Sequence, residues 1–414
     1  MHEQVPSAPR LTTALLPIMG VVLVAFLVIG FAMPILPLHV HLGLGLDTFV
    51  VGLVAGSQFA AALISRPWAG NYADRRGAKR AVVVGLLLAA ASGLLYLLSL
   101  QLAGSPGLSA AVLVAGRLLL GGAESVIITG GVSWGFALAG AQNTGRVIAW
   151  VGAAMFAAFA IGAPIGSALY DAFGFAAIAL ATTLLPLATL LVVAPLAPVP
   201  SATQVRPSFL RVLGSVALSG LGAALSSVGF GAIIAFVTLL YAERGWSHGW
   251  LPYTMFAAVF ILARLLWGHL PDRLGGARVA LVCLTIEAAG LALIGTASSP
   301  VVALLGAGLT GLGYSLVYPG FGVEAVLRVP AQSRGLAMGA YTAFLDLALG
   351  VGGPALGLIA GAIGFGPVFL VSALLVLAAA PIALRFLPHK GSHEDSRSAA
   401  RPARAFRLLG SRGA

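Results

Sequence analysis

The amino-acid sequence predicts an all-α, polytopic membrane protein with 12 transmembrane helices in two pseudo-symmetric six-helix bundles. Three observations lead to this fold class: an apolar composition, twelve long apolar segments, and a motif that occurs once in each half. Of the 414 residues, 59% are hydrophobic and only 8% are charged, whereas soluble domains are about 25% charged. So few charged side chains cannot cover a water-soluble globule of this size, which excludes a soluble enzyme.

Twelve apolar segments are long enough to cross a bilayer, which takes about 20 mostly apolar residues. We expect helices at residues 12–38, 48–69, 81–100, 109–139, 147–169, 175–196, 213–241, 250–268, 278–296, 300–323, 335–363 and 366–386. A polar, proline-containing stretch after the sixth segment divides the chain into two halves. The expected domains are an N-terminal bundle, a cytoplasmic linker, a C-terminal bundle and a basic cytoplasmic tail, at residues 1–196, 197–212, 213–386 and 387–414.

Positive charge is concentrated on one side of these helices. Of the 23 Lys and Arg residues, all except Arg117 and Arg244 lie before the first helix, at every second loop, or in the tail. The positive-inside rule then places both termini in the cytoplasm. The net charge of +11 therefore indicates topology and not binding to nucleic acid. The basic tail either attracts anionic lipid or a partner, or is a solvated segment that helps to set the topology.

The strongest internal repeat is a short motif after the second and the eighth helix. Residues 70–77 and 268–275 both read G-x-x-x-D-R-x-G, 198 positions apart, and each copy has an arginine four residues upstream, at Arg66 and Arg264. Pro164 and Pro354, each among glycines, recur at a spacing of 190. Two halves in the same orientation are a known transporter architecture, with the substrate site between them.

These motifs resemble those of the major facilitator superfamily over nearly the whole chain. GNYADRRGAKR at residues 70–80 is similar to the family's loop signature, and Arg117-x-x-x-Gly121 is similar to its R-x-x-x-G motif. Tyr72 and Ala78 depart from the loop signature. Four segments resemble the YhhS/YfcJ-like subfamily of bacterial facilitators: SRPWAGNYAD, GRVIAW, GFGAIIAFVTLLY and YTAFLDLALGVGGPALG.

The resemblance implies that the repeated motif latches the two halves together on the cytoplasmic side. We expect a glycine at the end of the second helix to let the backbone turn, and each motif Asp to pair with a cation on a neighbouring helix. The alternative is an ordinary cytoplasmic turn made basic by topology. The residues assigned to the latch are Gly70, Asp74, Arg75 and Gly77 with Arg146 as partner, and Gly268, Asp272, Arg273 and Gly275 with Arg334 as partner.

Ionisable side chains inside the helices are the candidates for proton coupling, because each costs at least about 2.5–3.5 kcal/mol to place in lipid. Arg117 and Glu124 lie seven residues apart on one helix face, and the resemblance implies that they face a central cavity. A static pair that stabilises their helix is the alternative. Asp346 has no obvious cation nearby in sequence, and is either a proton carrier or a hydrogen-bonded staple between helices. Glu287 is interpreted mainly as a packing or interhelical hydrogen-bonding residue.

By resemblance, helices 1, 4, 7 and 10 line the substrate cavity. Their side chains are mostly apolar with few polar anchors, which favours a small amphipathic or moderately polar solute. Ordinary helix packing is the alternative interpretation. The cavity candidates are Phe31, Ser125, Thr129, Trp134, Ser227, Phe230, Tyr314 and Tyr318.

The proline segments give a weak indication of direction. Residues 162–166, around Pro164, resemble a sequence that the family associates with exporters, although the spacing is shortened. Pro354 fits that spacing better but lies in the other half. A plain helix kink is the alternative at both positions.

No phosphate-binding loop, metal-ligand cluster or nucleophile elbow occurs in the sequence. We therefore expect no cofactor and no enzymatic reaction. The function predicted is a secondary active transporter, a monomer in the lipid bilayer, that moves a small organic solute by alternating access. Proton-coupled efflux is the first hypothesis. A proton-coupled importer and a non-transporting membrane sensor or scaffold are the alternatives.

Overall fold

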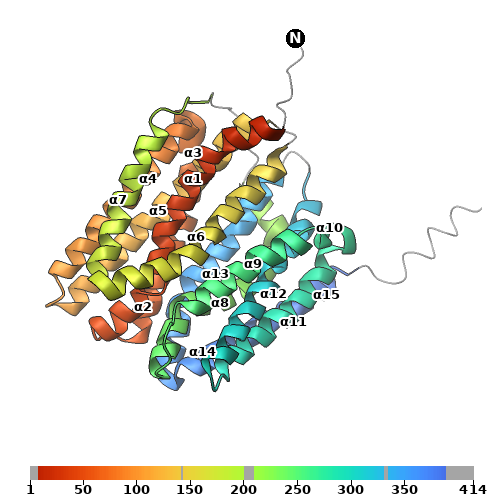
Figure 1. Ribbon diagram of the computed structural model, residues 1–414. Coiled ribbons are helices and arrows are strands. Elements are labelled where there is room, and N and C mark those ends of the chain that lie inside the picture. The colour runs from red at the N-terminus through yellow and green to blue at the C-terminus, as the bar shows by residue number, and fades with distance from the viewer. Residues whose placement is uncertain (1–7, 141–142, 200–208, 331–333, 388–414) are drawn as a thin grey trace, which may run out of the picture.

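The computed structural model describes residues 8–140, 143–199, 209–330 and 334–387, and these residues form helices and turns with no β-strand among them. Figure 1 shows the two halves of the chain as two sets of long helices side by side. The fold class predicted from the sequence is confirmed.

The first half begins with an interrupted helix and continues with five long ones. Its elements are α1 (Ala8–Ala32), α2 (Leu36–Leu38), the π-helix η1 (His39–Gly43), α3 (Thr48–Arg76), α4 (Ala78–Gln101), α5 (Pro106–Ala139), α6 (Thr144–Phe173) and α7 (Phe175–Val193). α4 packs between α5 and α7, while α1 packs on α6 and α3 on α5.

The second half repeats this arrangement. Its elements are α8 (Phe209–Glu243), α9 (Leu251–Trp267), α10 (Leu270–Leu274), α11 (Gly276–Gly295), α12 (Pro300–Leu327), α13 (Arg334–Ile363), α14 (Phe365–Leu377) and α15 (Ala380–Arg385). α11 packs between α12 and α14, while α8 packs on α13 and α9 on α12.

Eleven helices of the described residues are long and apolar enough to cross a membrane, and Leu251–Trp267 is a shorter apolar helix. Together they correspond to the twelve predicted segments. Two of the predicted segments are interrupted in the structure. The first segment is not one helix, because residues 33–35 form a turn before α2 and η1, and the last is divided by a turn between α14 and α15.

The expected turn at Gly70 is wrong. α3 continues through Gly70 and Asp74 to Arg76, and the chain turns at Gly77, whose φ of 93° favours glycine. In the second copy the helix does stop at Gly268, and the short α10 carries Asp272 before the turn at Gly275, with φ 92°. The last glycine of each motif is therefore the residue that allows the sharp turn.

The two ends of the molecule differ in charge. One end, which we call the basic end, holds the turn between α3 and α4, the turn between α10 and α11, and the end of α12. Its described cations are Arg75, Arg76, Lys79, Arg80, Arg273, Arg278, Arg328 and Arg385. The other end, which we call the opposite end, carries η1 and the loop before α9, with Arg244.

Candidate functional site

The two halves meet along two helix pairs, of which the first is formed by α3 and α13. Glycines allow the backbones to touch here: a Cβ on Gly52 would overlap the Gly353 carbonyl, and a Cβ on Gly56 would lie 2.6 Å from the Gly350 oxygen. The Thr48 hydroxyl donates to the Gly357 carbonyl at 2.7 Å. We call this contact, made by residues 48–66 and 346–357, the α3–α13 junction. It extends from the opposite end of the molecule to the middle of both helices.

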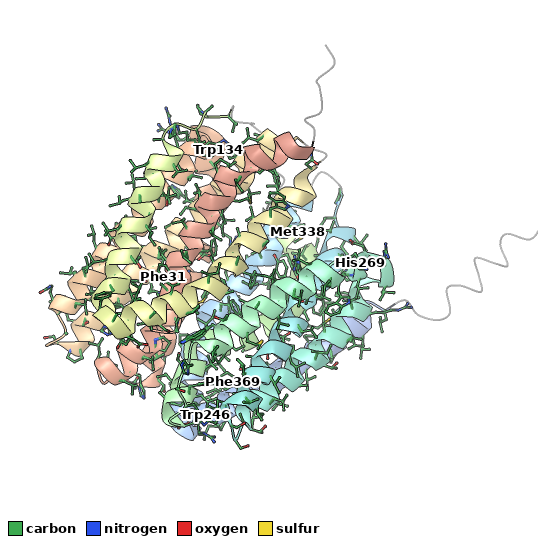
Figure 2. All side chains as sticks on the ribbon, in the orientation of Figure 1. Phe31, Trp134, Trp246, His269, Met338 and Phe369 are labelled. Atoms are coloured by element: carbon green, nitrogen blue, oxygen red, sulfur yellow. The ribbon has the colours of Figure 1, made fainter. Side chains whose placement is uncertain are left out.

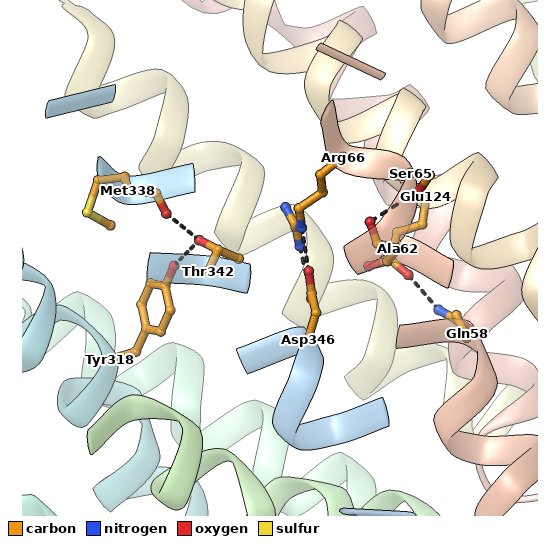
Figure 3. A network of polar contacts seen from close by, with 9 residues as sticks. All are labelled: Gln58, Ala62, Ser65, Arg66, Glu124, Tyr318, Met338, Thr342 and Asp346. Atoms are coloured by element: carbon orange, nitrogen blue, oxygen red, sulfur yellow. Dashed lines mark hydrogen bonds and ion pairs between the residues drawn. The ribbon is translucent and has the colours of Figure 1, made fainter. Parts of the chain in front are cut away.

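An ion pair between the two halves lies at the inner limit of the α3–α13 junction. Arg66 Nε donates to Asp346 Oδ2, and Arg66 Nη2 donates to Asp346 Oδ1 at 3.0 Å, so the contact is bidentate (Figure 3). The Asp346 side chain is only 3% exposed, whereas Arg66 is 25% exposed. Two-point geometry of this kind strengthens an Arg–carboxylate pair and fixes its orientation.

The ion pair gives Asp346 a partner that the sequence did not indicate. No cation lies near Asp346 in the chain, as expected, but Arg66 contacts it from 280 residues away. Arg66 had been noted only as the arginine before the first motif copy. Its recurrence at Arg264 was the signal that could have marked it as a functional residue.

A second polar contact links α3 to α5 within the first half. Gln58 Nε2 donates to Glu124 Oε2 at 2.6 Å (Figure 3). Arg117 is 2% exposed, and its Nε lies 3.4 Å from the Val54 carbonyl of α3. A Cβ on Gly121 would overlap the Gln58 carbonyl, so this glycine allows α5 to approach α3. The structure thus places Arg117 and Glu124 against α3, and these two described residues form no ion pair with each other.

Tyrosines of the second half lie beside the ion pair. The Tyr318 hydroxyl is 2.6 Å from Thr342 Oγ1, and Thr342 donates to the Met338 carbonyl at 2.8 Å (Figure 3). Tyr341 donates to the Tyr318 carbonyl at 2.7 Å. Tyr318 lies within electrostatic reach of both Arg66 and Arg264.

The second contact between the halves is formed by α6 and α9. Phe156 and Phe260 stack with ring centroids 3.6 Å apart, and Thr254 donates to the Ala160 carbonyl at 2.9 Å. A cavity of about 470 Å³ lies on this contact, lined by Ala157, Ala160, Ile161, Ala258, Ile261, Leu262 and Leu265. We call this contact the α6–α9 junction.

Some of the cavity candidates lie together, at the inner side of the α6–α9 junction. Phe230 is 5.5 Å from Tyr314 and 6.4 Å from Phe156, measured between ring centroids. Ser227 Oγ lies 3.3 Å from the Tyr314 hydroxyl. Phe230 of α8 and Tyr314 of α12 thus form one aromatic cluster with rings of α6 and α9.

The other cavity candidates are not brought to this cluster. Phe31 is buried, and its backbone packs against Gly166 of α6. Trp134 is buried near the basic end of α5, well apart from Phe31 (Figure 2). Ser125 is buried with no hydrogen-bond partner for its hydroxyl, and Thr129 is half-buried one turn further along α5.

Glu287 is fully buried and contacts a neighbouring helix. It accepts a hydrogen bond from Ser226 of α8 at 2.6 Å, while its second oxygen has no hydrogen-bond partner. The contact joins α11 to α8, both in the second half.

The latch residues lie at the basic end, on α3, α10 and the turns that follow. Asp74 is half-buried, while Asp272, Arg273 and Arg75 are exposed. The side chains of the expected partners, Arg146 and Arg334, lie outside the described residues. A contact that the sequence did not predict is made by Lys79, which donates to the carbonyls of Ala194 and Leu196 at 2.7 and 2.6 Å.

Both candidate helix-kink prolines lie where their helices pack tightly. Near Pro164, Gly162 and Gly166 approach the backbone of α1 closely. Pro354 lies in the α3–α13 junction, where its Cδ is 3.2 Å from the position of a Cβ on Gly56. Both prolines are inside continuous helices.

Two bundles of membrane-spanning helices, with ionisable and aromatic side chains gathered where they meet, define a membrane transport protein of two repeated halves. A sequence model of the Major Facilitator Superfamily matches residues 18–253 and 219–413. An MFS-type transporter of Pseudomonas aeruginosa (strain UCBPP-PA14) is 43% identical over 361 residues, covering 87% of this chain and 90% of the relative. An MFS-type transporter of Burkholderia mallei (strain SAVP1) is 44% identical over 390 residues, covering 92% of this chain and 94% of the relative. The chain belongs to the Major Facilitator Superfamily.

Solved structures agree with this fold. A mutant of the nucleoside transporter NupG matches with a TM-score of 0.75 and 16% identity, covering 91% of this chain and 100% of that one. The D-xylose-proton symporter matches with a TM-score of 0.73 and 15% identity, covering 91% of this chain and 98% of that one. Membership of this family points to a multi-pass transport protein rather than an enzyme. The closer resemblance to the YhhS/YfcJ-like subfamily stays a prediction.

Proposed function

We propose that this protein is a proton-coupled secondary active transporter that exports a small organic solute by alternating access. The observation that carries the proposal is the Arg66–Asp346 ion pair, because it joins the two halves at mid-helix through a carboxylate that can bind a proton. Alternating access requires the halves to separate first at one end and then at the other. A contact whose strength depends on one proton connects that movement to a proton gradient.

The proposed coupling step takes place at the carboxylate of Asp346. A proton on this group removes its negative charge, so the bidentate contact with Arg66 weakens and the α3–α13 junction can open. Glu124 lies within electrostatic reach of Arg66, on the same half of the molecule. Arg66 therefore keeps an acidic neighbour after it leaves Asp346, which limits the cost of an unpaired cation inside the membrane.

Several further assignments belong to the same proposal. The protein acts as a monomer in the bacterial inner membrane, with both termini in the cytoplasm. Its bundles comprise residues 1–196 and 213–386, and the pairs Asp74–Arg146 and Asp272–Arg334 latch the cytoplasmic side. Export is favoured over import by the resemblance of the Pro164 segment to an exporter motif.

Proteoliposomes with an imposed pH gradient test this proposal. A panel of small organic solutes is assayed with the wild type and with Asp346→Asn and Glu124→Gln, and Glu243→Gln serves as control because Glu243 is an exposed carboxylate at the opposite end. We expect gradient-driven flux in the wild type and the control. Asp346→Asn should lose the dependence on the gradient, and Glu124→Gln should reduce it.

Two results would contradict the proposal. Solute flux that is indifferent to the pH gradient in the wild type would remove proton coupling. Undiminished gradient-driven flux in both carboxylate variants would remove the assignment of the proton site. The direction of flux relative to the proton gradient decides between export and import.

A further inference from the structure

Arg264 is a cation in the last turn of α9, and it has no acidic partner among the described residues. Its Nη1 donates to the Ser315 carbonyl at 2.9 Å, and its guanidinium lies 6.0 Å from the centre of the Phe260 ring. Among the residues that the structure describes, no carboxylate forms an ion pair with it. The titratable groups within its electrostatic reach are the hydroxyls of Tyr314, Tyr318 and Tyr341.

The internal repeat shows where a partner would be. Arg264 stands 198 residues after Arg66, and the counterpart of Asp346, at the repeat spacing of 190, is Phe156. Arg66 and Asp346 form a closed ion pair. At the equivalent positions, Arg264 is present but the aromatic ring of Phe156 replaces the carboxylate.

An arginine held in this way has unused hydrogen-bonding capacity. A guanidinium carries five N–H donors in a planar fork that matches a carboxylate, and one of them is directed at Ser315. The side chain is exposed, so a solute can reach it. Because an unpaired charge on a membrane-spanning helix is unfavourable, a bound anion that pairs with the guanidinium would stabilise it.

The surroundings of Arg264 fit the rest of an amphipathic molecule. Phe260 lies under the guanidinium and stacks on Phe156, and Phe230 and Tyr314 continue the same aromatic cluster. The Tyr318 hydroxyl is nearby and already shared with Thr342. The site thus offers one positive charge beside an aromatic surface.

We propose that Arg264 binds the carboxylate of an amphipathic organic monoanion, whose apolar part packs on Phe156, Phe260 and Tyr314. The ligand supplies the negative charge that Asp346 supplies to Arg66. This inference rests on the proposed transport function, since it names the substrate class of the same site. It does not depend on proton coupling.

Equilibrium binding to the purified, detergent-solubilised full chain tests the inference without any gradient. The probe is radiolabelled phenylacetate, and the competitors are unlabelled phenylacetate and phenylacetamide, which has the same ring and no charge. We expect saturable binding that phenylacetate displaces and the amide displaces at least about tenfold less well. No saturable binding, or equal displacement by the amide, would overturn the inference.

Variants then locate the charge. Arg264→Gln should weaken phenylacetate binding about tenfold or more, and Arg264→Lys should retain part of the affinity because it keeps the charge without the fork. Arg278→Gln removes an exposed cation of the same half and should bind as the wild type does. Equal losses in Arg264→Gln and Arg278→Gln would mean that only the overall positive potential attracts the anion.

The pair Phe156→Asp and Phe156→Asn tests the argument from the repeat. Both remove the ring, but only Asp restores a carboxylate at the position equivalent to Asp346. We expect Phe156→Asp to bind phenylacetate at least about fivefold more weakly than Phe156→Asn, because the new carboxylate pairs with Arg264. Equal affinities would overturn the argument.

The two proposals fail in different ways. If phenylacetate binds through Arg264 but flux ignores the pH gradient, only proton coupling is wrong. If gradient-driven flux of other solutes depends on Asp346 and phenylacetate does not bind, only the substrate class is wrong.

Discussion

The two junctions between the halves occupy equivalent places in the internal repeat but are built from different side chains. In the α3–α13 junction, Gly56 approaches the Gly350 carbonyl so closely that no side chain fits between them. At the equivalent positions of the α6–α9 junction, Thr254 donates to the Ala160 carbonyl. The carbonyl oxygens of Gly350 and Ala160 are thus equivalent in the repeat. The first is contacted by the backbone of Gly56, and the second accepts a hydrogen bond from the Thr254 hydroxyl.

The ionisable groups differ in the same way. The α3–α13 junction ends in a closed Arg66–Asp346 pair. The α6–α9 junction carries a Phe156–Phe260 stack next to Arg264, which has no ion-pair partner among the described residues. A repeated architecture therefore does not imply two identical gates. In the proposals above, the first junction responds to a proton, and the second presents a charge and an aromatic surface to a ligand.

The largest effect is expected from breaking the ion pair on one side only. Arg66→Gln leaves Asp346 buried without its cation, and loss of one partner of a buried pair typically costs about 3–5 kcal/mol. The double variant Arg66→Gln with Asp346→Asn removes both charges and should regain much of this stability. The free energies of unfolding of the detergent-solubilised single and double variants, each compared with the wild type, measure both effects. A double variant as unstable as the single one would show that the two charges do not stabilise each other.

A smaller effect is expected from a single methyl group in the α3–α13 junction. Gly353→Ala places a Cβ against the Gly52 carbonyl, and overpacking of this kind costs about 1–3 kcal/mol. Gly352→Ala is the matched control, because a Cβ on this neighbouring residue meets nothing within 4 Å. The control should be neutral or stabilised by up to about 1 kcal/mol through helix propensity. Equal unfolding midpoints for the two variants would contradict close packing at Gly353.

The smallest effect is expected in the α6–α9 junction. Thr254→Val keeps the shape of the side chain and removes one hydrogen bond between the halves, which in membrane proteins is worth about 0.6 kcal/mol on average. Thr285→Val is the control, since Thr285 donates only within its own helix, to the Val282 carbonyl. A loss for Thr254→Val above about 2 kcal/mol would mean that this junction depends on its hydroxyl as strongly as the other depends on its glycines.

The helices were predictable because their signals are local. Twenty or so apolar residues in a row are sufficient to indicate a span, and the last glycine of each repeated motif stands at a positive φ. The end of α3 was placed too early, because Asp74, Arg75 and Arg76 indicated a loop. Long charged side chains can instead remain on a helix that leaves the apolar region, and the helix stops only at Gly77.

The contacts between the helices were not predictable in the same way. Arg66 and Asp346 are 280 residues apart, and no periodicity within either helix encodes which helix it will meet. The cavity candidates were chosen by helix number alone, which cannot tell how far along the helix a side chain lies. For that reason Phe31 and Trp134 were grouped as residues of one cavity, although the structure places them well apart (Figure 2).

The glycine-lined contact in the α3–α13 junction has a consequence for the speed and reversibility of opening. Side chains that are immobilised in an interface lose rotamer entropy, up to about 1.5–2 kcal/mol for the long ones, whereas glycine has none to lose. Closing this junction therefore orders fewer side chains than a contact lined by long residues would, and those that hydrogen-bond across it include Thr48, Arg66 and Asp346. Under the proposed coupling, the contact opens and closes with little reorganisation, and the charge state of the Arg66–Asp346 pair sets the equilibrium between the two states.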